Sequence, residues 1–230
     1  IRTEDKLLIR EFLDNQNISD VAELVDENDE YASQIVGSMS IHLLRHGDTA
    51  QRSYRGQLDD PLSALGWRQL REAVEGMAWD HVVSSSLSRC AAFARELSER
   101  RGLPLRIDAR LVEYHFGAWQ GVPIETIAER EGEALGRFWR DPVAYPPPGG
   151  ETFDAFRARL SEALDDVAVE ASSARVLVVT HGGAIRLLRC MAEGRDFGDM
   201  AGIDVPHASL HSLAWRRVAA AREATRSSEA

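Results

Sequence analysis

Two short stretches of the chain end in the same way, and together they indicate how it folds. Residues 41–50 read "IHLLRHGDTA" and residues 176–185 read "VLVVTHGGAI", so each apolar run leads directly into a histidine and a glycine. A short apolar run is typical of a strand buried on both faces, and glycine permits the tight turn that follows. If the strands are neighbours in a parallel sheet, their carboxyl ends deliver His46 and His181 to one ligand site.

The segments around these two runs alternate between strand and helix patterns. We expect strands at Ile41–Leu44, His81–Ser84, Leu105–Ile107, Val176–Thr180 and Leu210–Val218. We expect helices at Ser63–Gly76, Ser88–Arg101, Pro123–Glu131, Glu133–Trp139, Glu151–Ala168 and Ala184–Ala192. This alternation predicts an α/β fold, a three-layer sandwich in which a largely parallel sheet is flanked by helices.

Composition narrows the class of protein. The chain has 230 residues, 44% hydrophobic and 28% charged, as in one ordinary globular domain. No apolar stretch approaches the roughly 20 residues that cross a bilayer, and no secretory leader opens the chain. We therefore expect a cytoplasmic protein with no membrane partner, in which Cys90 and Cys190 are reduced and buried. The net charge of −10, without a basic stripe, disfavours nucleic acid as a partner.

Composition also changes sharply near residue 38. Residues 1–38 hold 3 basic and 10 acidic side chains, and they contain the only lysine and all three asparagines of the chain. The junction reads Gly37-Ser38-Met39, so we interpret residues 1–38 as an acidic leader of cloning or otherwise foreign origin. A natural acidic extension is the alternative. Residues 39–218 then form the domain, and residues 219–230 a flexible tail.

Arginines accompany the two histidines. Arg45 directly precedes His46, and Arg89 lies where a predicted strand gives way to a helix. A phosphate monoester is a dianion that suits the planar fork of arginine, and a helix start adds amide donors. An imidazole among such donors could attack phosphorus, and a second one could help to bind the phosphate oxygens. A carboxylic acid must then protonate the leaving oxygen, but position alone does not choose among the many acids.

Five motifs occur in a fixed order along the chain. They are "LLRHGDT", "SSSLSRC", "EYHFGAWQG", "PPPGGET" and "VVTHGGAIRLL". In this order they resemble the histidine phosphatase (phosphoglycerate mutase-like) superfamily over residues 41–216. The resemblance implies a phosphoglycerate mutase-like fold in which His46 is the nucleophile and Glu113 the proton donor. It implies a full catalytic set of His46, Glu113, His181, Arg45 and Arg89.

The same resemblance implies further contacts with substrate. Thr49 and Gln57 match positions that often line the site, and His115 either lines it or only packs beside it. Arg52 stands where many members carry asparagine, which puts one phosphate contact in doubt. The histidines His42, His81, His207 and His211 are expected to be structural, because they lack the spacing of a zinc site. Neither a metal nor a cofactor is expected.

The motifs also suggest a branch of the family and a substrate. "RGQLDDPLSALGW", "EYHFGAWQG" and "FWRDPVAYPPPGGE" resemble the alpha-ribazole phosphatases of cobalamin biosynthesis. We expect a small phosphate ester as the ligand, with Trp119, Phe116, Phe138 and Trp139 as an apolar wall. A phosphoglycerate would need additional cations, and between Leu111 and Glu151 the arginines are only Arg130, Arg137 and Arg140. The alternatives are a phosphoglycerate mutase-type isomerase, a broad sugar phosphatase and a non-catalytic phospho-ligand binder; oligomeric state is left open.

Overall fold

The computed structural model describes residues 41–215, so the predicted leader 1–38 and tail 219–230 lie outside it. The described strands are β1 (Ile41–Arg45), β2 (His81–Ser85), β3 (Leu105–Asp108), β4 (Val176–Thr180) and β5 (Leu210–Leu213). The described α-helices are α4 (Ala64–Ala73), α5 (Ser88–Arg101), α6 (Ile124–Arg140), α7 (Phe153–Ala171) and α8 (Gly182–Glu193). Short 3-10 helices are η1 (Ala109–Leu111), η2 (Gly117–Trp119) and η3 (Phe197–Gly202).

The strands form one sheet in the order β3-β2-β4-β1-β5. β1, β2, β3 and β4 run parallel, and β5 lies antiparallel to β1 at one edge. Arg45 is paired with Thr180, so β1 and β4 end level with one another. The prediction that these two strands are neighbours is confirmed, and the residues that follow them meet at one edge of the sheet.

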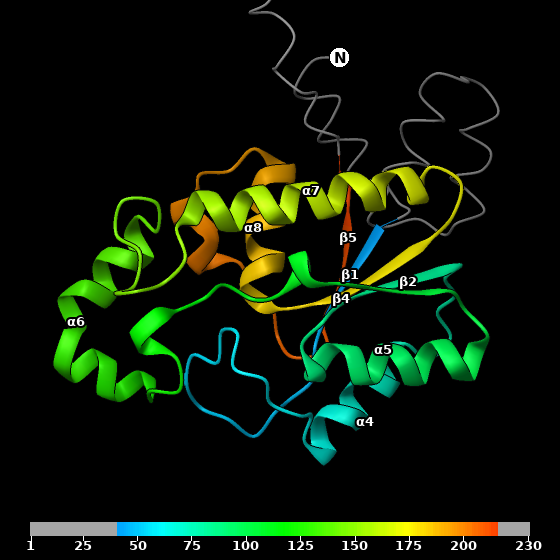
Figure 1. The fold of residues 1–230 in the computed structure, drawn as a ribbon, viewed down its shortest axis with the longest axis horizontal. Coiled ribbons are helices and arrows are strands. Elements are labelled where there is room, and N and C mark those ends of the chain that lie inside the picture. The colour runs from blue at the N-terminus through cyan, green and yellow to red at the C-terminus, as the bar shows by residue number, and fades with distance from the viewer. Residues whose placement is uncertain (1–40, 216–230) are drawn as a thin grey trace, which may run out of the picture.

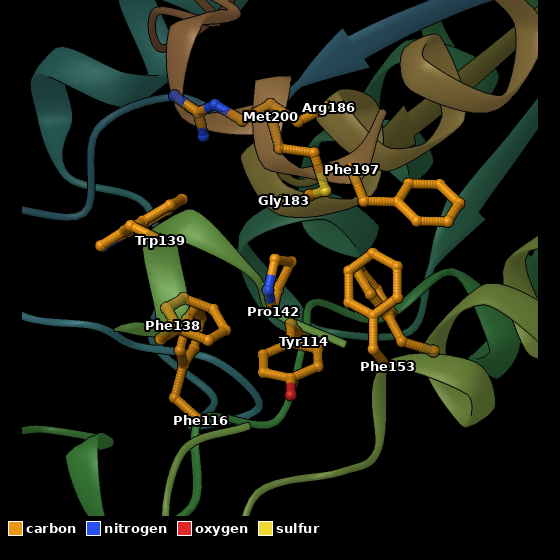
Figure 2. A pocket seen from close by; sticks show the side chains of 11 residues that line it. Tyr114, Phe116, Phe138, Trp139, Pro142, Phe153, Gly183, Arg186, Phe197 and Met200 are labelled. Atoms are coloured by element: carbon orange, nitrogen blue, oxygen red, sulfur yellow. The ribbon is translucent and has the colours of Figure 1, made fainter. Parts of the chain in front are cut away.

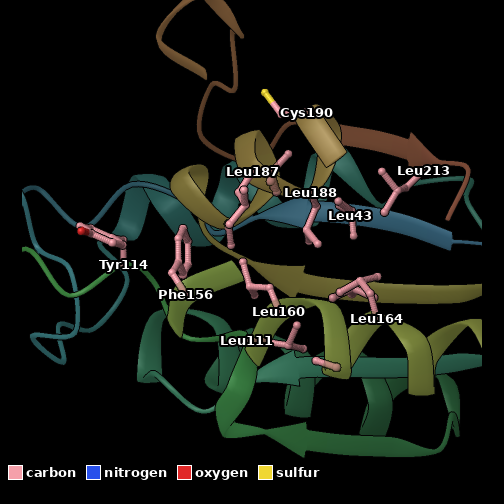
Figure 3. Close-up of a cluster of buried hydrophobic side chains, with 14 of the residues drawn as sticks. Leu43, Leu111, Tyr114, Phe156, Leu160, Leu164, Leu187, Leu188, Cys190 and Leu213 are labelled. Carbon is pink, nitrogen blue, oxygen red and sulfur yellow. The ribbon is translucent and has the colours of Figure 1, made fainter. Parts of the chain in front are cut away.

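Helices cover both faces of the sheet, as Figure 1 shows, with α7 and α8 above it and α4 and α5 below. Side chains alternate along each strand, so Leu43 and Val178 point into one hydrophobic cluster while Leu44 and Val179 point into the other. The first cluster packs against α7 and α8 (Figure 3), and the second against α4 and α5. The predicted three-layer sandwich with a largely parallel sheet is confirmed.

The helices begin and end close to where the sequence places them. Gly102 follows the end of α5 and adopts the left-handed conformation with φ of 65°, and Ser63 and Thr152 cap α4 and α7. The two helices predicted around residues 123–139 form one element, α6, with a break at Glu131. α8 begins at Gly182 rather than Ala184, so His181 directly precedes it. Cys90 and Cys190 are buried and unpaired, as predicted.

Candidate active site

His46 lies at the carboxyl end of β1 and is almost buried, with 8% of its surface exposed. Its backbone amide donates to Thr180 on β4, which continues the pairing of the two strands. Its Nδ1 lies 2.8 Å from the carbonyl oxygen of Gly47, and because a carbonyl only accepts, Nδ1 carries the proton. Burial and the nearby Arg89 hold the pKa of His46 well below its usual range. The ring is therefore neutral, with a lone pair on Nε2.

His181 lies at the end of β4, and its ring centre is 5.2 Å from that of His46. Arg89 donates from Nε to Nδ1 of His181 over 3.3 Å, and Nε2 lies 2.8 Å from the hydroxyl of Ser85. Since the Nε–H of arginine only donates, Nδ1 is unprotonated and Nε2 donates to Ser85. Complete burial, followed by the charge of Arg89, lowers the pKa of His181 well below its usual range. The strand register thus brings two neutral imidazoles together.

Arg45 and Arg89 place two guanidinium groups beside these rings. Arg89 is buried and donates to the carbonyl oxygens of Leu58 and Gly56 at 2.7 and 2.6 Å. Arg45 donates to the carbonyl of Val205, and its Nε is buried without a hydrogen-bond partner. Within residues 41–215 neither arginine forms an ion pair with a carboxylate. The positive charge is left for an anion, and the unpartnered Nε of Arg45 is a donor that a phosphate oxygen could satisfy.

His207 lies in the same site, which corrects the expectation that it is only structural. Its Nε2 is 3.0 Å from Nη2 of Arg45, and its ring centre is 5.6 Å from that of His46. Burial and the charge of Arg45 lower the pKa of His207 to about 4. The cause is topological: because β5 is antiparallel to β1, the turn before β5 lies beside the end of β1. The direction of β5, which the sequence pattern does not reveal, was the missing signal.

Glu113 reaches the site from the segment that follows η1. Its Oε2 accepts from the amide of Gly183 in the first turn of α8, and its Oε1 accepts from Tyr114, both at 2.9 Å. A Cβ atom on Gly183 would overlap Oε1 of Glu113, so the glycine leaves the space that the carboxylate occupies. The predicted proton donor therefore lies at the amino end of the helix that His181 precedes.

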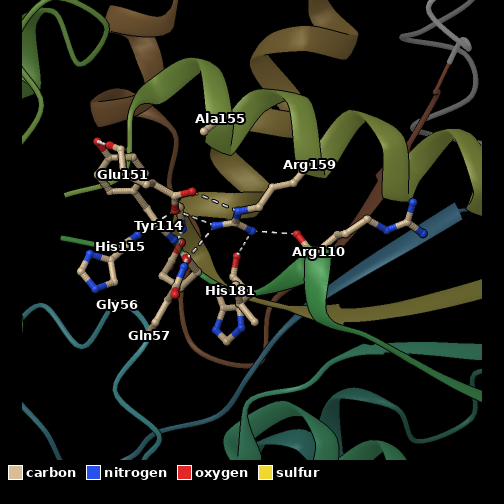
Figure 4. Close-up of polar contacts among 12 residues, drawn as sticks. Gly56, Gln57, Arg110, Tyr114, His115, Glu151, Ala155, Arg159 and His181 are labelled. Carbon is tan, nitrogen blue, oxygen red and sulfur yellow. Dashed lines mark hydrogen bonds and ion pairs between the residues drawn. The ribbon is translucent and has the colours of Figure 1, made fainter. Parts of the chain in front are cut away.

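Arg159 on α7 and Glu151, both labelled in Figure 4, hold the backbone around Glu113. Arg159 donates to the carbonyl oxygens of Arg110, Val112 and Glu113 at 2.6–2.9 Å. Both oxygens of Glu151 accept from the same guanidinium, and Oε1 also accepts from the amide of His115. This Arg159–Glu151 pair was missed by sequence reasoning, because Arg159 is one of many arginines in amphipathic helices and nothing local distinguishes it.

The other predicted contact residues lie near the site but differ in what they touch. Gln57 donates from Nε2 to the carbonyl of Glu113, so it supports the acid rather than facing a ligand. Both ring nitrogens of His115 have partners in its own loop, Gly117 and Gln120. Thr49 is half-buried, and its hydroxyl has no hydrogen-bond partner in the described part of the chain. Arg52 is exposed and pairs with Asp48 at 3.3 Å, and both charges act on His207.

Figure 2 shows an aromatic cleft that is open to solvent. It is lined by Tyr114, Phe116, Phe138, Trp139, Pro142, Phe153, Phe156, Gly183, Arg186, Phe197 and Met200. Tyr114 and Gly183 are the residues whose amides hold the Glu113 carboxylate, so the cleft opens beside the acid. Trp119 is not part of it: that ring is buried in the core, and its Nε1 donates to Glu131.

Two further findings concern metals and membranes. Among residues 41–215 no group of three or more His, Cys, Asp and Glu side chains is arranged to hold a metal ion. In the same range no helix is both long and apolar enough to span a bilayer.

Comparison with known proteins agrees with this geometry. The family model described as the histidine phosphatase superfamily (branch 1) matches residues 41–224. The bifunctional protein Rv2228c of Mycobacterium tuberculosis (strain ATCC 25618 / H37Rv) is 37% identical over 175 residues, which make up 73% of this chain and 48% of that protein. The chain thus spans about half the length of this relative.

Two similar proteins are named for substrates. Glucosyl-3-phosphoglycerate phosphatase of Mycolicibacterium vanbaalenii (strain DSM 7251 / JCM 13017 / BCRC 16820 / KCTC 9966 / NRRL B-24157 / PYR-1) is 36% identical over 160 residues, 64% of this chain and 70% of that protein. The crystal structure of the alpha-ribazole phosphatase from Shigella flexneri superimposes with a TM-score of 0.64 and 25% identity, over 76% of this chain and 96% of that chain.

Proposed function

The chain belongs to the histidine phosphatase superfamily, and from that membership we propose that it hydrolyses phosphate monoesters through a phosphohistidine formed on His46. One observation carries the proposal. The hydrogen bond from Nδ1 of His46 to Gly47 fixes the tautomer in which Nε2 is the nucleophilic nitrogen. The lowered pKa of His46 keeps that nitrogen unprotonated at neutral pH.

In the first step Nε2 of His46 attacks phosphorus, and the bond from phosphorus to the ester oxygen breaks. Glu113, as general acid, gives a proton to the leaving oxygen. Arg45 and Arg89 stabilise the charge on the phosphoryl oxygens. Arg89 has five N–H groups, of which three are used within the protein, so donors remain for the phosphoryl group.

In the second step water attacks the phosphohistidine. Glu113, now a carboxylate, takes a proton from that water as the nitrogen–phosphorus bond breaks, and phosphate leaves. In this structure the N–H at Nε2 of His181 donates to Ser85. If that hydrogen bond were redirected to the ligand, His181 would bind a phosphoryl oxygen. The second step thus returns to Glu113 the proton that it gave in the first, and it frees Nε2 of His46.

The proposed hydrolysis needs no metal ion, because two guanidinium groups supply the charge that a metal supplies in other phosphatases. Release of p-nitrophenol from p-nitrophenyl phosphate, with and without EDTA, tests this. We expect equal rates. An enzyme that EDTA inactivates and that zinc or magnesium restores would contradict metal independence.

Alpha-ribazole 5′-phosphate is the first candidate substrate. Its support is the aromatic cleft beside Glu113, in which Phe116, Phe138 and Trp139 could bury a flat apolar base, and the likeness to the Shigella flexneri structure. A second candidate is glucosyl-3-phosphoglycerate, favoured by the relative at 36% identity and by Arg186 in the cleft. The arginine count along residues 111–151 did not include Arg186, because that residue lies on α8.

Values of kcat/KM for the two esters and for 3-phosphoglycerate test the substrate. A higher value for alpha-ribazole 5′-phosphate supports the first candidate, and a higher value for glucosyl-3-phosphoglycerate the second. Conversion of 3-phosphoglycerate into its isomer, without release of phosphate, would indicate a mutase. Binding of every ester without turnover would indicate a non-catalytic phospho-ligand binder.

A further inference from the structure

Arg186 is the charged residue among those that line the aromatic cleft. It lies on α8 and is half-buried, and it donates from Nε to the carbonyl of Ile203 at 2.9 Å. Its Nη groups form neither a hydrogen bond nor an ion pair within residues 41–215. Asp204 lies near this part of the molecule but is exposed and forms no ion pair with Arg186 in the described range. A partly buried guanidinium thus lacks a counter-ion.

Arg186 also lies next to the arginine that faces the phosphoryl group. A Cβ atom placed on Gly182 would be 3.2 Å from Nη1 of Arg186 and 3.3 Å from Nε of Arg45. Both guanidinium groups are therefore close to the same point at the start of α8. Figure 2 shows the Arg186 side chain extending along the rim of the cleft toward Trp139, and so on the side of the aromatic walls.

Arginine remains charged in proteins, so a half-buried guanidinium without an acid favours an anionic ligand. A carboxylate suits its planar fork best, because two parallel hydrogen bonds can form. Apart from the hydroxyl of Tyr114, which donates to the carbonyl of Glu151, the aromatic side chains that line the cleft offer such a cation only their faces.

We propose that Arg186 determines specificity by binding a carboxylate on the alcohol part of the substrate, while the aromatic walls of the cleft hold the remainder of that alcohol. This inference rests on the proposed phosphatase function and favours the second candidate substrate, glucosyl-3-phosphoglycerate, which carries a carboxylate, over alpha-ribazole 5′-phosphate, which carries none. It assigns the site a dianionic phosphoryl group at Arg45 and Arg89 and a second, separate anion at Arg186.

Three aryl esters test the proposal: phenyl phosphate, 3-carboxyphenyl phosphate and its neutral isostere 3-carbamoylphenyl phosphate. The wild-type protein should prefer the carboxylate over the carbamoyl ester by about tenfold or more in kcat/KM, the scale of one charge-assisted hydrogen-bond pair. In Arg186→Met this ratio should fall to about one, and Arg186→Lys should give an intermediate ratio. Arg189→Met, on the same helix and outside the cleft, should keep the wild-type ratio.

Because the ratio compares two esters on one preparation, partial loss of folded protein does not change it. A wild-type ratio near one, or an equal loss on all three esters in Arg186→Met with the ratio unchanged, would overturn the proposal. The second outcome would place Arg186 on the phosphoryl group instead.

Absence of turnover of any ester by the wild-type protein would reject the phosphatase function separately. Calorimetric binding of the two substituted esters then decides the role of Arg186. If the wild-type protein binds the carboxyphenyl ester more tightly than the carbamoylphenyl ester, and Arg186→Met does not, the proposed role of Arg186 is supported. If each protein binds the two esters with equal affinity, that role is rejected.

Discussion

The two halves of the site are built in different ways. In the half around His46 and His181, the functional residues directly follow two paired strands, so the register of β1 and β4 fixes their distance. In the half around Glu113, this residue lies in an irregular segment held by Arg159 from α7 and by the amide of Gly183. The proposed nucleophile is therefore positioned by the sheet, and the proposed acid and the cleft by contacts between distant parts of the chain.

Among substitutions in the first half of the site, the one at His46 should cause the largest loss of activity. His46→Ala should lower kcat by about 10⁴-fold or more, because the covalent step is lost. Acid-quenched reactions with ³²P-labelled substrate should trap an acid-labile label on the wild-type protein and none on the variant. An acid-stable label, or one that persists in His46→Ala, would contradict the assignment.

Arg89 tests how far the first half depends on its anion-binding donors. Arg89→Ala should lower kcat by about 10²–10³-fold, the usual cost of one donor to developing charge. It should also lower the melting temperature, because the carbonyls of Leu58 and Gly56 lose a donor. The control is Arg95→Ala on the exposed face of the same helix. A loss below threefold in a folded Arg89 variant would place the phosphate elsewhere.

The second half is tested at Glu113 and at the glycine that admits it. Glu113→Gln should slow hydrolysis of an alkyl phosphate by about 10²-fold, and much less that of p-nitrophenyl phosphate, whose leaving group needs little protonation. Gly183→Ala should also slow the alkyl ester more than the p-nitrophenyl ester, but by a smaller factor, because the new Cβ displaces the carboxylate. Gly132→Ala on α6, where a Cβ meets no neighbour, is the control. Equal losses on both esters would make Glu113 structural.

The Arg159–Glu151 pair should act through Glu113 and therefore produce a smaller effect of the same kind. Arg159→Lys keeps the charge but loses the fork that holds three carbonyls, and should slow the alkyl ester by about tenfold more than the p-nitrophenyl ester. Arg157→Lys, exposed on the same helix, should leave the two rates in their wild-type ratio. A uniform loss in Arg159→Lys would show that the pair only stabilises the fold.

The smallest effect expected is that of pH on stability. Folding lowers the pKa values of His46, His181 and His207, so the unfolded chain binds more protons below about pH 6.5. The contribution of these histidines to the free energy of unfolding is fully present above that pH. It declines as the pH falls, by up to about 1.4 kcal/mol per pH unit for each histidine. Urea unfolding between pH 7 and pH 5 measures how the free energy of unfolding depends on pH. This dependence should be shallower for His207→Asn than for the wild-type protein. An unchanged dependence would contradict the burial of a neutral His207.

The contrast also explains what could be predicted from the sequence. The sheet and the positions of His46 and His181 followed from apolar runs and glycine turns, which are local patterns. His207 was missed because its place depends on the direction of β5, and Arg186 because a cleft is assembled from α6, α8 and η3. Trp119 was assigned to the wall because an aromatic pattern does not distinguish a core ring from a lining one.

The position of β1 in the sheet has a consequence for biosynthesis. β1 is made first among the described strands, yet its partners are β4 and β5, more than 130 residues later. Its apolar side chains and unpaired backbone groups stay exposed on the ribosome until almost the whole domain has emerged. We expect a nascent chain that ends before β5 to be inactive and to depend on chaperones. Activity should therefore appear only when synthesis of the domain is nearly complete.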